Sequence, residues 1–230
     1  MQLNLDYFKE RCIMGEFWNQ SWDSIDMERV YQYIEGSSSL PDFTINFLKR
    51  RHAKCVCDAG CGCGVYSLRL ALNGFKVFGF DISATAVKIS KKLAANNNVG
   101  NMDFQVCSIL ETCYRENQFD AVISRDVIDH MTLTNGIAAV KELYRITKYG
   151  GTIILSLDRL DSEYEAEPHI VDSDGSYLFT DGKWKGMVFH PYSKDQISTL
   201  VQVGSIKCME STDDGFRVII EKNMHVTAGM

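Results

Sequence analysis

A chain of 230 residues is long enough for one sizeable α/β domain and short for two. Its 45% hydrophobic and 23% charged residues are ordinary for a globular protein and exclude wholesale disorder. The net charge of −6 argues against nucleic acid as a partner, because basic residues on phosphates supply most of the affinity for a duplex. No apolar run approaches the roughly 20 residues that span a bilayer, and residues 1–10 do not resemble a signal peptide. We therefore expect a cytoplasmic protein without a membrane partner.

The first 52 residues have a helical, aromatic-rich pattern, and from residue 53 strand and helix signals alternate. This alternation is typical of a parallel sheet with helices on its faces. A long helix is expected to end at Tyr149-Gly150-Gly151, before a fifth strand. The expected strands are 54–58, 76–80, 102–107, 119–124 and 152–157, and the first two helices between them are 65–73 and 83–96.

An acidic stretch, residues 158–174, follows the fifth strand and precedes a predicted hairpin of residues 177–180 and 186–190 around Asp181-Gly182. A helix at 194–201 and two strands complete the pattern. The fold class is a Rossmann-like three-layer α/β sandwich with a seven-stranded, mostly parallel sheet, an N-terminal helical cap and a β-hairpin lid. We expect a single domain, residues 1–230, made of a cap (1–52), a core (53–157), a lid insertion (158–192) and the end of the sheet (193–222).

The loop from Asp58 to Gly64, Asp-Ala-Gly-Cys-Gly-Cys-Gly, lies directly between a predicted strand and a predicted helix. Glycines at that point let the backbone turn tightly and let a ligand approach closely. A dinucleotide fingerprint would need a third glycine at position 65, which is Val65. Asp58 would repel a pyrophosphate and attract an ammonium group, and Asp81 ends the next strand, where a carboxylate can accept both hydroxyl protons of a ribose.

With the segments 77–83, 119–124 and 148–151, this loop resembles the class I S-adenosylmethionine-dependent methyltransferases, in their small-molecule branch. The resemblance covers about residues 40–157 and implies S-adenosylmethionine as the cofactor. The family often has an acid after strand three, and Ser108 stands there instead, so we expect a weaker polar clamp on the adenine from Ser108. Ile109, the next residue, is assigned to the same cofactor site. The resemblance further assigns the methionine end to Asp58, Gly60 and Gly62, the ribose to Asp81, the adenine to Ile82 and the floor below the sulfonium to Ser124.

Three residues are candidates for catalysis. Asp129 and His130 follow strand four, and His130 is the better candidate base because its unperturbed pKa lies near neutrality. His190 ends the hairpin and could reach the site from the lid. Packing at the start of a helix or the end of a strand remains the alternative for all three.

Aromatic residues of the cap could close over a sulfonium, which favours aromatic faces, or could simply pack the first helices on the sheet. Trp18 is the candidate that we assign to the cofactor site; the others are Trp22, Tyr7 and Tyr31. Four cysteines at 55, 57, 61 and 63 are spaced as C-x-C pairs, unlike the C-x2-C pairs of structural zinc sites, so we expect no metal.

Methylation of DNA amino groups is excluded because no proline follows strand four, and cytosine-C5 methylation is excluded because no Pro-Cys pair exists. The leading hypothesis is methyl transfer to O, N or S of a small molecule. The alternatives are a non-catalytic cofactor-binding module that regulates a partner, and a cyclase or decarboxylase on the same fold.

Overall fold

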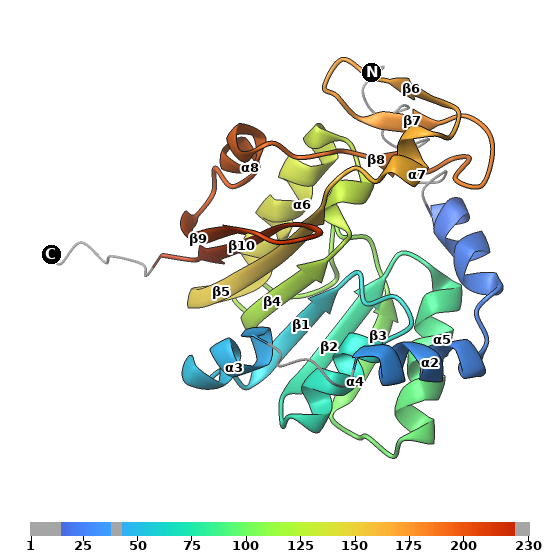
Figure 1. Ribbon diagram of the computed structural model, residues 1–230. Coiled ribbons are helices and arrows are strands. Elements are labelled where there is room, and N and C mark those ends of the chain that lie inside the picture. Colours follow the sequence, from blue (N-terminus) through green and yellow to red (C-terminus); the bar gives the residue numbers. More distant parts are fainter. Residues whose placement is uncertain (1–14, 38–42, 224–230) are drawn as a thin grey trace, which may run out of the picture.

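A seven-stranded sheet crosses the centre of the computed structural model, which describes residues 15–37 and 43–223 (Figure 1). Four neighbouring pairs are parallel, whereas the strand next to the last in the order is antiparallel to both of its neighbours. The order is β3 (Met102–Val106), β2 (Lys76–Asp81), β1 (Cys55–Ala59), β4 (Phe119–Arg125), β5 (Thr147–Asp158), β10 (Gly215–Glu221) and β9 (Ser205–Ser211). The predicted Rossmann-like three-layer fold is confirmed.

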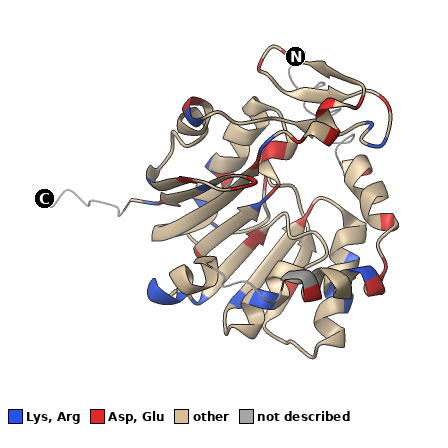
Figure 2. Ribbon diagram, viewed as in Figure 1, with Lys and Arg blue, Asp and Glu red and all other residues tan. Residues whose placement is uncertain are grey.

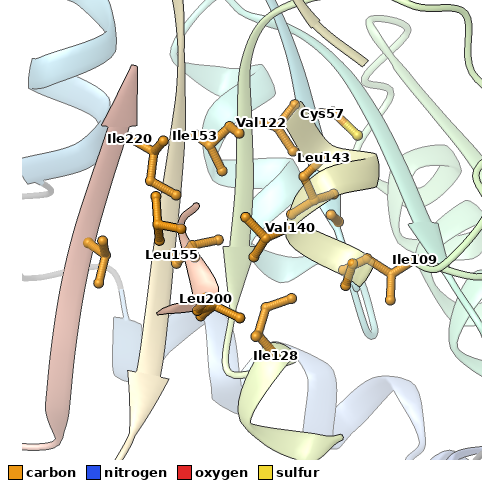
Figure 3. Close-up of a cluster of buried hydrophobic side chains, with 14 of the residues drawn as sticks. Cys57, Ile109, Val122, Ile128, Val140, Leu143, Ile153, Leu155, Leu200 and Ile220 are labelled. Carbon is orange, nitrogen blue, oxygen red and sulfur yellow. The ribbon is translucent and has the colours of Figure 1, made fainter. Parts of the chain in front are cut away.

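Helices cover both faces of this sheet. On one face, Ile45 and Leu48 of α3 (Phe43–Arg50) pack with Leu70 of α4 (Val65–Leu72) over Ile123 and Ile154 of the sheet. The other face packs against α6 (Leu133–Ile146) and α8 (Lys194–Leu200), and Figure 3 shows part of that cluster. Burying both faces explains why the central strands are almost continuously apolar.

The helix α5 (Ala84–Asn96) begins where the sequence predicted. Ser83 is its N-cap, and the Ser83 hydroxyl accepts a hydrogen bond from the backbone N–H of Ala86 (3.1 Å). This contact satisfies one of the N–H groups that the first helical turn leaves without a partner.

The end of α6 was predicted wrongly. The helix ends at Ile146 and β5 begins at Thr147, so the segment 149–151 belongs to a strand. The Thr147 hydroxyl donates to the carbonyl of Leu143 (2.7 Å), and Gly150 donates to the carbonyl of Lys222 (2.7 Å). The pairing of β4 with β5 skips residues 148–151 in an irregularity of the ladder. A glycine pair therefore marks a bulge within the strand here instead of a helix end.

The region after β5 forms a second, three-stranded sheet. The predicted hairpin is present as β7 (Tyr177–Phe179) and β8 (Val188–Phe189), which pair antiparallel. A third strand, β6 (His169–Val171), pairs with β7 and was not predicted, because it is short and lies in the acidic stretch. A short helix, α7 (Ser162–Glu165), precedes it.

The described N-terminal residues form two helices outside α3. Residues 15–23 are helical, and α2 (Met27–Ser37) packs Val30 against Leu68 and Leu93. Asn19 Oδ1 accepts a hydrogen bond from the Ser83 hydroxyl (2.9 Å), which ties residues 15–23 to the start of α5. No helix in the described ranges combines the length and apolar character needed to cross a membrane.

Candidate functional site

A cavity of about 830 Å³ lies over the carboxyl ends of β1, β2, β4 and β5 and the first residues of β10. Open α/β sheets bind ligands at this edge, where the strand order reverses between β1 and β4. The cavity therefore extends from the glycine loop to β10, which lies outside the residues 40–157 that the resemblance covers.

The glycine loop requires its glycines. Gly60 and Gly62 have φ angles of 78° and 51°, in the left-handed region that favours glycine. A Cβ added at Gly60 would lie 2.4 Å from Cγ2 of Val127, and one at Gly62 would lie 2.8 Å from the ring of Trp22. The backbone N–H of Gly60 donates to the carbonyl of Phe80 (2.8 Å), which holds the loop over the end of β2. The loop is thus a fixed cradle with its backbone exposed to the cavity.

Two buried carboxylates border this cradle. Asp81 accepts hydrogen bonds from the backbone N–H groups of Gly62 and Ser83, both at 2.9 Å, and burial raises its pKa. Asp58 accepts from the Ser67 hydroxyl (2.5 Å), and burial raises its pKa to about 6 against the opposing effects of that bond and of Arg125. Among the residues with described positions, neither carboxylate forms an ion pair. An ammonium group at Asp58 and a pair of hydroxyls at Asp81 would match these acceptors.

The predicted adenine residues also line the cavity. Ile82, Ser108 and Ile109 border it beside Leu110, and the Ser108 oxygen accepts from the backbone N–H of Leu110 (3.2 Å). A serine oxygen has a second lone pair and a proton, so Ser108 can still bond a ligand. The donors, acceptors and apolar walls therefore fit S-adenosylmethionine.

The aromatic residues of the cap divide into two groups. Trp18 and Trp22 line the cavity, whereas Tyr31 does not; Tyr7 lies outside the described residues. The Trp18 ring meets the imidazole of His130 edge to face, with the ring centroids 4.9 Å apart. The helical residues 15–23 therefore form one wall of the cavity.

The structure does not place Ser124 on the cavity, in contrast to the role that the resemblance implied. Side chains alternate along a strand, and the register pairs Ser124 with Leu155, on the face that packs against α6. Its fully buried hydroxyl has no hydrogen-bond partner within the described parts of the chain. The neighbours Ile123 and Arg125 line the cavity instead.

Asp129 and His190 also lie outside the cavity lining, so the predicted catalytic set is not brought together. Asp129 is fully buried in η1 (Ile128–His130), where its Oδ2 accepts from the backbone N–H of Asp158 (3.0 Å). Burial, with Asp126 nearby, raises the Asp129 pKa to about 7. His190 is equally buried, with Nδ1 2.9 Å from the Ser176 hydroxyl and its N–H donating to the Asp129 carbonyl. These two residues join η1 to β5 and β8.

His130 alone of the three candidates lines the cavity. Burial lowers its pKa to about 4, against an opposing effect of Asp126, so the imidazole is neutral near pH 7. Its Nδ1 has no hydrogen-bond partner in the described segments. The Nδ1 atom is itself buried, so it is a polar atom that the described chain leaves without a partner.

The sequence reasoning assigned no role to several polar residues at the far end of the cavity, although Asp126 follows strand four beside the candidates Asp129 and His130. Asp126 has a φ of 56°, rare for a residue other than glycine, and its Oδ1 accepts from the Ser156 hydroxyl (2.6 Å). Burial, and then Asp126, raises the pKa of Asp158 to about 7. The position of Asp158 at the end of β5 was an available signal, since ligands bind at carboxyl ends of parallel strands. No motif marked the two arginines there, Arg125 and Arg217.

The clustered cysteines form no disulfide with one another or with the other described cysteines. None of the seven cysteines at described positions is in a disulfide, and no group of three His, Cys, Asp or Glu residues in those ranges could hold a metal ion. Burial raises the pKa of the Cys57, Cys61 and Cys63 thiols, so these side chains pack as neutral groups.

Comparisons with known proteins agree with this geometry. Residues 51–205 match a family model described as "Methyltransferase domain". The chain is 32% identical over 105 residues to the O-antigen chain terminator bifunctional methyltransferase/kinase WbdD of Escherichia coli, matching 44% of this chain and only 15% of that protein. It is 27% identical over 163 residues to a ubiquinone biosynthesis O-methyltransferase of Acinetobacter baumannii, matching 67% of this chain and 64% of that protein.

A solved structure extends the likeness in fold. The PH0226 protein of Pyrococcus horikoshii OT3 superposes with a TM-score of 0.68 at 20% identity, over 85% of this chain and 92% of that one. With the family model covering well over half of the chain, and a cavity that fits the cofactor, the chain belongs to the class I S-adenosylmethionine-dependent methyltransferase family.

Proposed function

We propose that this protein transfers a methyl group from S-adenosylmethionine to O, N or S of a small-molecule acceptor. One observation carries the proposal: two buried carboxylates without ion-pair partners in the described chain, Asp58 and Asp81, border a glycine cradle in a cavity that continues to β5 and β10. When bound, S-adenosylmethionine supplies a sulfonium-activated methyl group.

Each residue of the cradle has a role in holding the cofactor under this proposal. Asp81 accepts the ribose hydroxyl protons, and Asp58 attracts the methionine ammonium, which would keep this carboxyl ionised. Backbone at Gly60 and Gly62 admits the methionine end, and Trp18 covers it. The adenine lies among Ile82, Ser108 and Ile109.

The acceptor occupies the remaining part of the cavity, between His130 and β10. A nucleophile that carries a proton needs a group to receive it. His130 and Asp158 both line the cavity, and Asp158 has the pKa closer to neutrality. We assign the proton to Asp158, and to the imidazole of His130 the role of shaping the wall of the cavity beside Trp18.

Two features support a small acceptor. The net charge of −6 is unfavourable for a polyanionic nucleic acid, and the Acinetobacter relative is named for O-methylation in ubiquinone biosynthesis.

A single methyltransferase domain with the predicted cap, core, lid and end of the sheet is part of the same proposal.

Transfer of an isotopic label from methyl-labelled S-adenosylmethionine tests this function. Incubation with fractionated metabolite extract should move the label to a small-molecule fraction, identified by mass spectrometry. Cofactor binding without label transfer to any fraction would favour the regulatory module. Conversion of a metabolite while the label stays on the cofactor would favour a cyclase or decarboxylase on this fold.

A further inference from the structure

Three neighbouring strands present a polar row to the cavity. The register pairs Arg125 of β4 with Ser156 of β5, and Ser156 with Arg217 of β10, so the three side chains share one face of the sheet. Two residues earlier on the same face, Ile123 and Ile154 are buried beneath α3. The apolar surface therefore gives way to two guanidinium groups flanking a serine, and all three residues line the cavity.

Aromatic rings position both guanidinium groups. The Arg125 guanidinium lies 4.4 Å from the ring centroid of Tyr66 on α4, and that of Arg217 lies 4.8 Å from the ring centroid of Phe43 on α3. Stacking on an aromatic face orients a planar guanidinium and leaves its edge N–H groups available to other partners. Arg69, on the same helix as Tyr66, also lines this region.

The two arginines of this row differ in their ion pairs. Arg51, Arg145 and Arg217 each form an ion pair with a carboxylate, whereas Arg125 forms none with any residue whose position is described. The partner of Arg217 is Glu210 (3.0 Å), which does not line the cavity, so Arg217 has further N–H groups to offer.

Acids also line this end of the cavity. Asp126 accepts a hydrogen bond from Ser156, and burial and then the proximity of Asp126 raise the pKa of Asp158 to about 7, so Asp158 carries only part of a negative charge near pH 7. Asp214 is exposed in the loop before β10. Figure 2 shows basic and acidic positions interspersed where the central strands end. An acceptor that matches this arrangement has a negative group at Arg125 and Arg217, and its reacting atom lies nearer to these acids.

We propose that the methyl acceptor carries an oxyanion, a carboxylate or a phosphate, that binds between Arg125 and Arg217. The proposal rests on the proposed function and names the class of its substrate. Guanidinium groups present paired N–H donors that match the geometry of both anions. Anchoring the acceptor there leaves its other end facing the cavity between β4 and the glycine loop, on the side of the cofactor.

Calorimetry on the complex with S-adenosylhomocysteine tests this inference without turnover. The test compounds are benzoate, phenyl phosphate and the neutral benzamide. We expect at least one anion to bind and benzamide to bind at least tenfold more weakly. Preference for benzoate identifies a carboxylate acceptor, and preference for phenyl phosphate a phosphorylated one.

Arginine variants locate the anion. Arg217→Gln should weaken binding of the anion at least tenfold, because it removes charge-assisted hydrogen bonds. Arg125→Gln should do the same, although Arg125 also lowers the pKa of Asp58, so Arg217→Gln is the cleaner variant. Arg51→Gln removes an exposed arginine outside the cavity and should leave anion binding unchanged.

Affinity for S-adenosylhomocysteine separates failure of this inference from failure of the proposed function. Arg217→Gln and Arg51→Gln should bind S-adenosylhomocysteine within a few-fold of the wild type, which also shows that they fold. Three results would overturn the inference if the cofactor binds normally. They are that neither anion binds, that benzamide binds as tightly as the anions, or that Arg217→Gln binds the anion as tightly as the wild type. Absence of S-adenosylhomocysteine binding in the wild type would instead overturn the proposed function.

Discussion

Among single residues, Asp81 combines a structural and a binding role, because the same carboxylate holds the backbone at Gly62 and faces the cavity. We expect Asp81→Ala to lower the affinity for S-adenosylhomocysteine at least tenfold, since each charge-assisted hydrogen bond is worth roughly 1.5–3 kcal/mol. Its thermal midpoint without ligand should fall as well, because two backbone N–H groups lose their acceptor. Calorimetry and thermal melts measure both effects, with Asp103→Ala on exposed β3 as the control. Unchanged affinity would remove Asp81 from the site.

The proton acceptor can be identified from the pH dependence of the rate. A base works when deprotonated, and burial and Asp126 raise the Asp158 pKa to about 7, so kcat/KM should rise with pH through neutrality. Asp158→Asn should lower kcat/KM by about a hundredfold and abolish this rise. His130→Ala should keep the rise, because burial holds the His130 pKa at about 4.

The measurement uses label transfer to the identified acceptor at several pH values, with Asp213→Asn, a neighbouring exposed acid, as the control. A pH profile unchanged in Asp158→Asn would contradict the assignment.

For the elements, the junction of η1 with β5 and β8 should make stability depend on pH. Burial raises the Asp129 pKa from 3.8 to about 7, so the folded protein keeps a proton that the unfolded chain releases. The unfolding free energy therefore falls as pH rises from about 4 to about 7. Asp129→Asn keeps an oxygen to accept from Asp158 N–H and removes the charge.

This variant should be more stable than the wild type above neutrality, by about 1 kcal/mol or more, and the difference should vanish in mild acid. Urea denaturation of the ligand-free protein at both pH values measures it. Equal unfolding free energies of the two proteins above neutrality would show that the ionised Asp129 carboxylate does not destabilise the folded protein.

Local sequence determined which elements could be predicted. Strand β2 was predictable because an apolar run ends in Asp81, and α5 because Ser83 caps it. The boundary at Thr147 was not predictable, since the bulge there depends on β10, far along the chain.

The site residues were likewise predictable only where they lie close together in the sequence. One loop and its neighbouring strand contain Asp58, Gly60, Gly62 and Asp81, whereas Arg125 and Arg217 become neighbours only through the pairing of three strands.

For the whole molecule, ligand binding should appear as added stability. A ligand present at about 100 times its Kd adds about 2.7 kcal/mol to the unfolding free energy. For a chain of this size that corresponds to a rise of roughly 5–10 °C in the thermal midpoint. We expect S-adenosylhomocysteine to produce the rise and NAD to produce none, because Val65 stands where a dinucleotide loop needs glycine. An equal shift with NAD would contradict the assignment of the loop.

The wall formed by residues 15–23 should also affect how fast the cofactor exchanges. Trp22 packs on the backbone of Gly62, and Asn19 and Asp23 accept hydrogen bonds from the hydroxyls of Ser83 and Thr85 at the start of α5. We predict that the spent cofactor leaves past this wall, which requires these contacts to break, whereas the acceptor at the β5 and β10 end of the cavity can exchange while they stay in place. We therefore expect the cofactor to exchange more slowly than the acceptor, so that a rapid-mixing measurement of label transfer shows an initial burst of product followed by a slower steady rate.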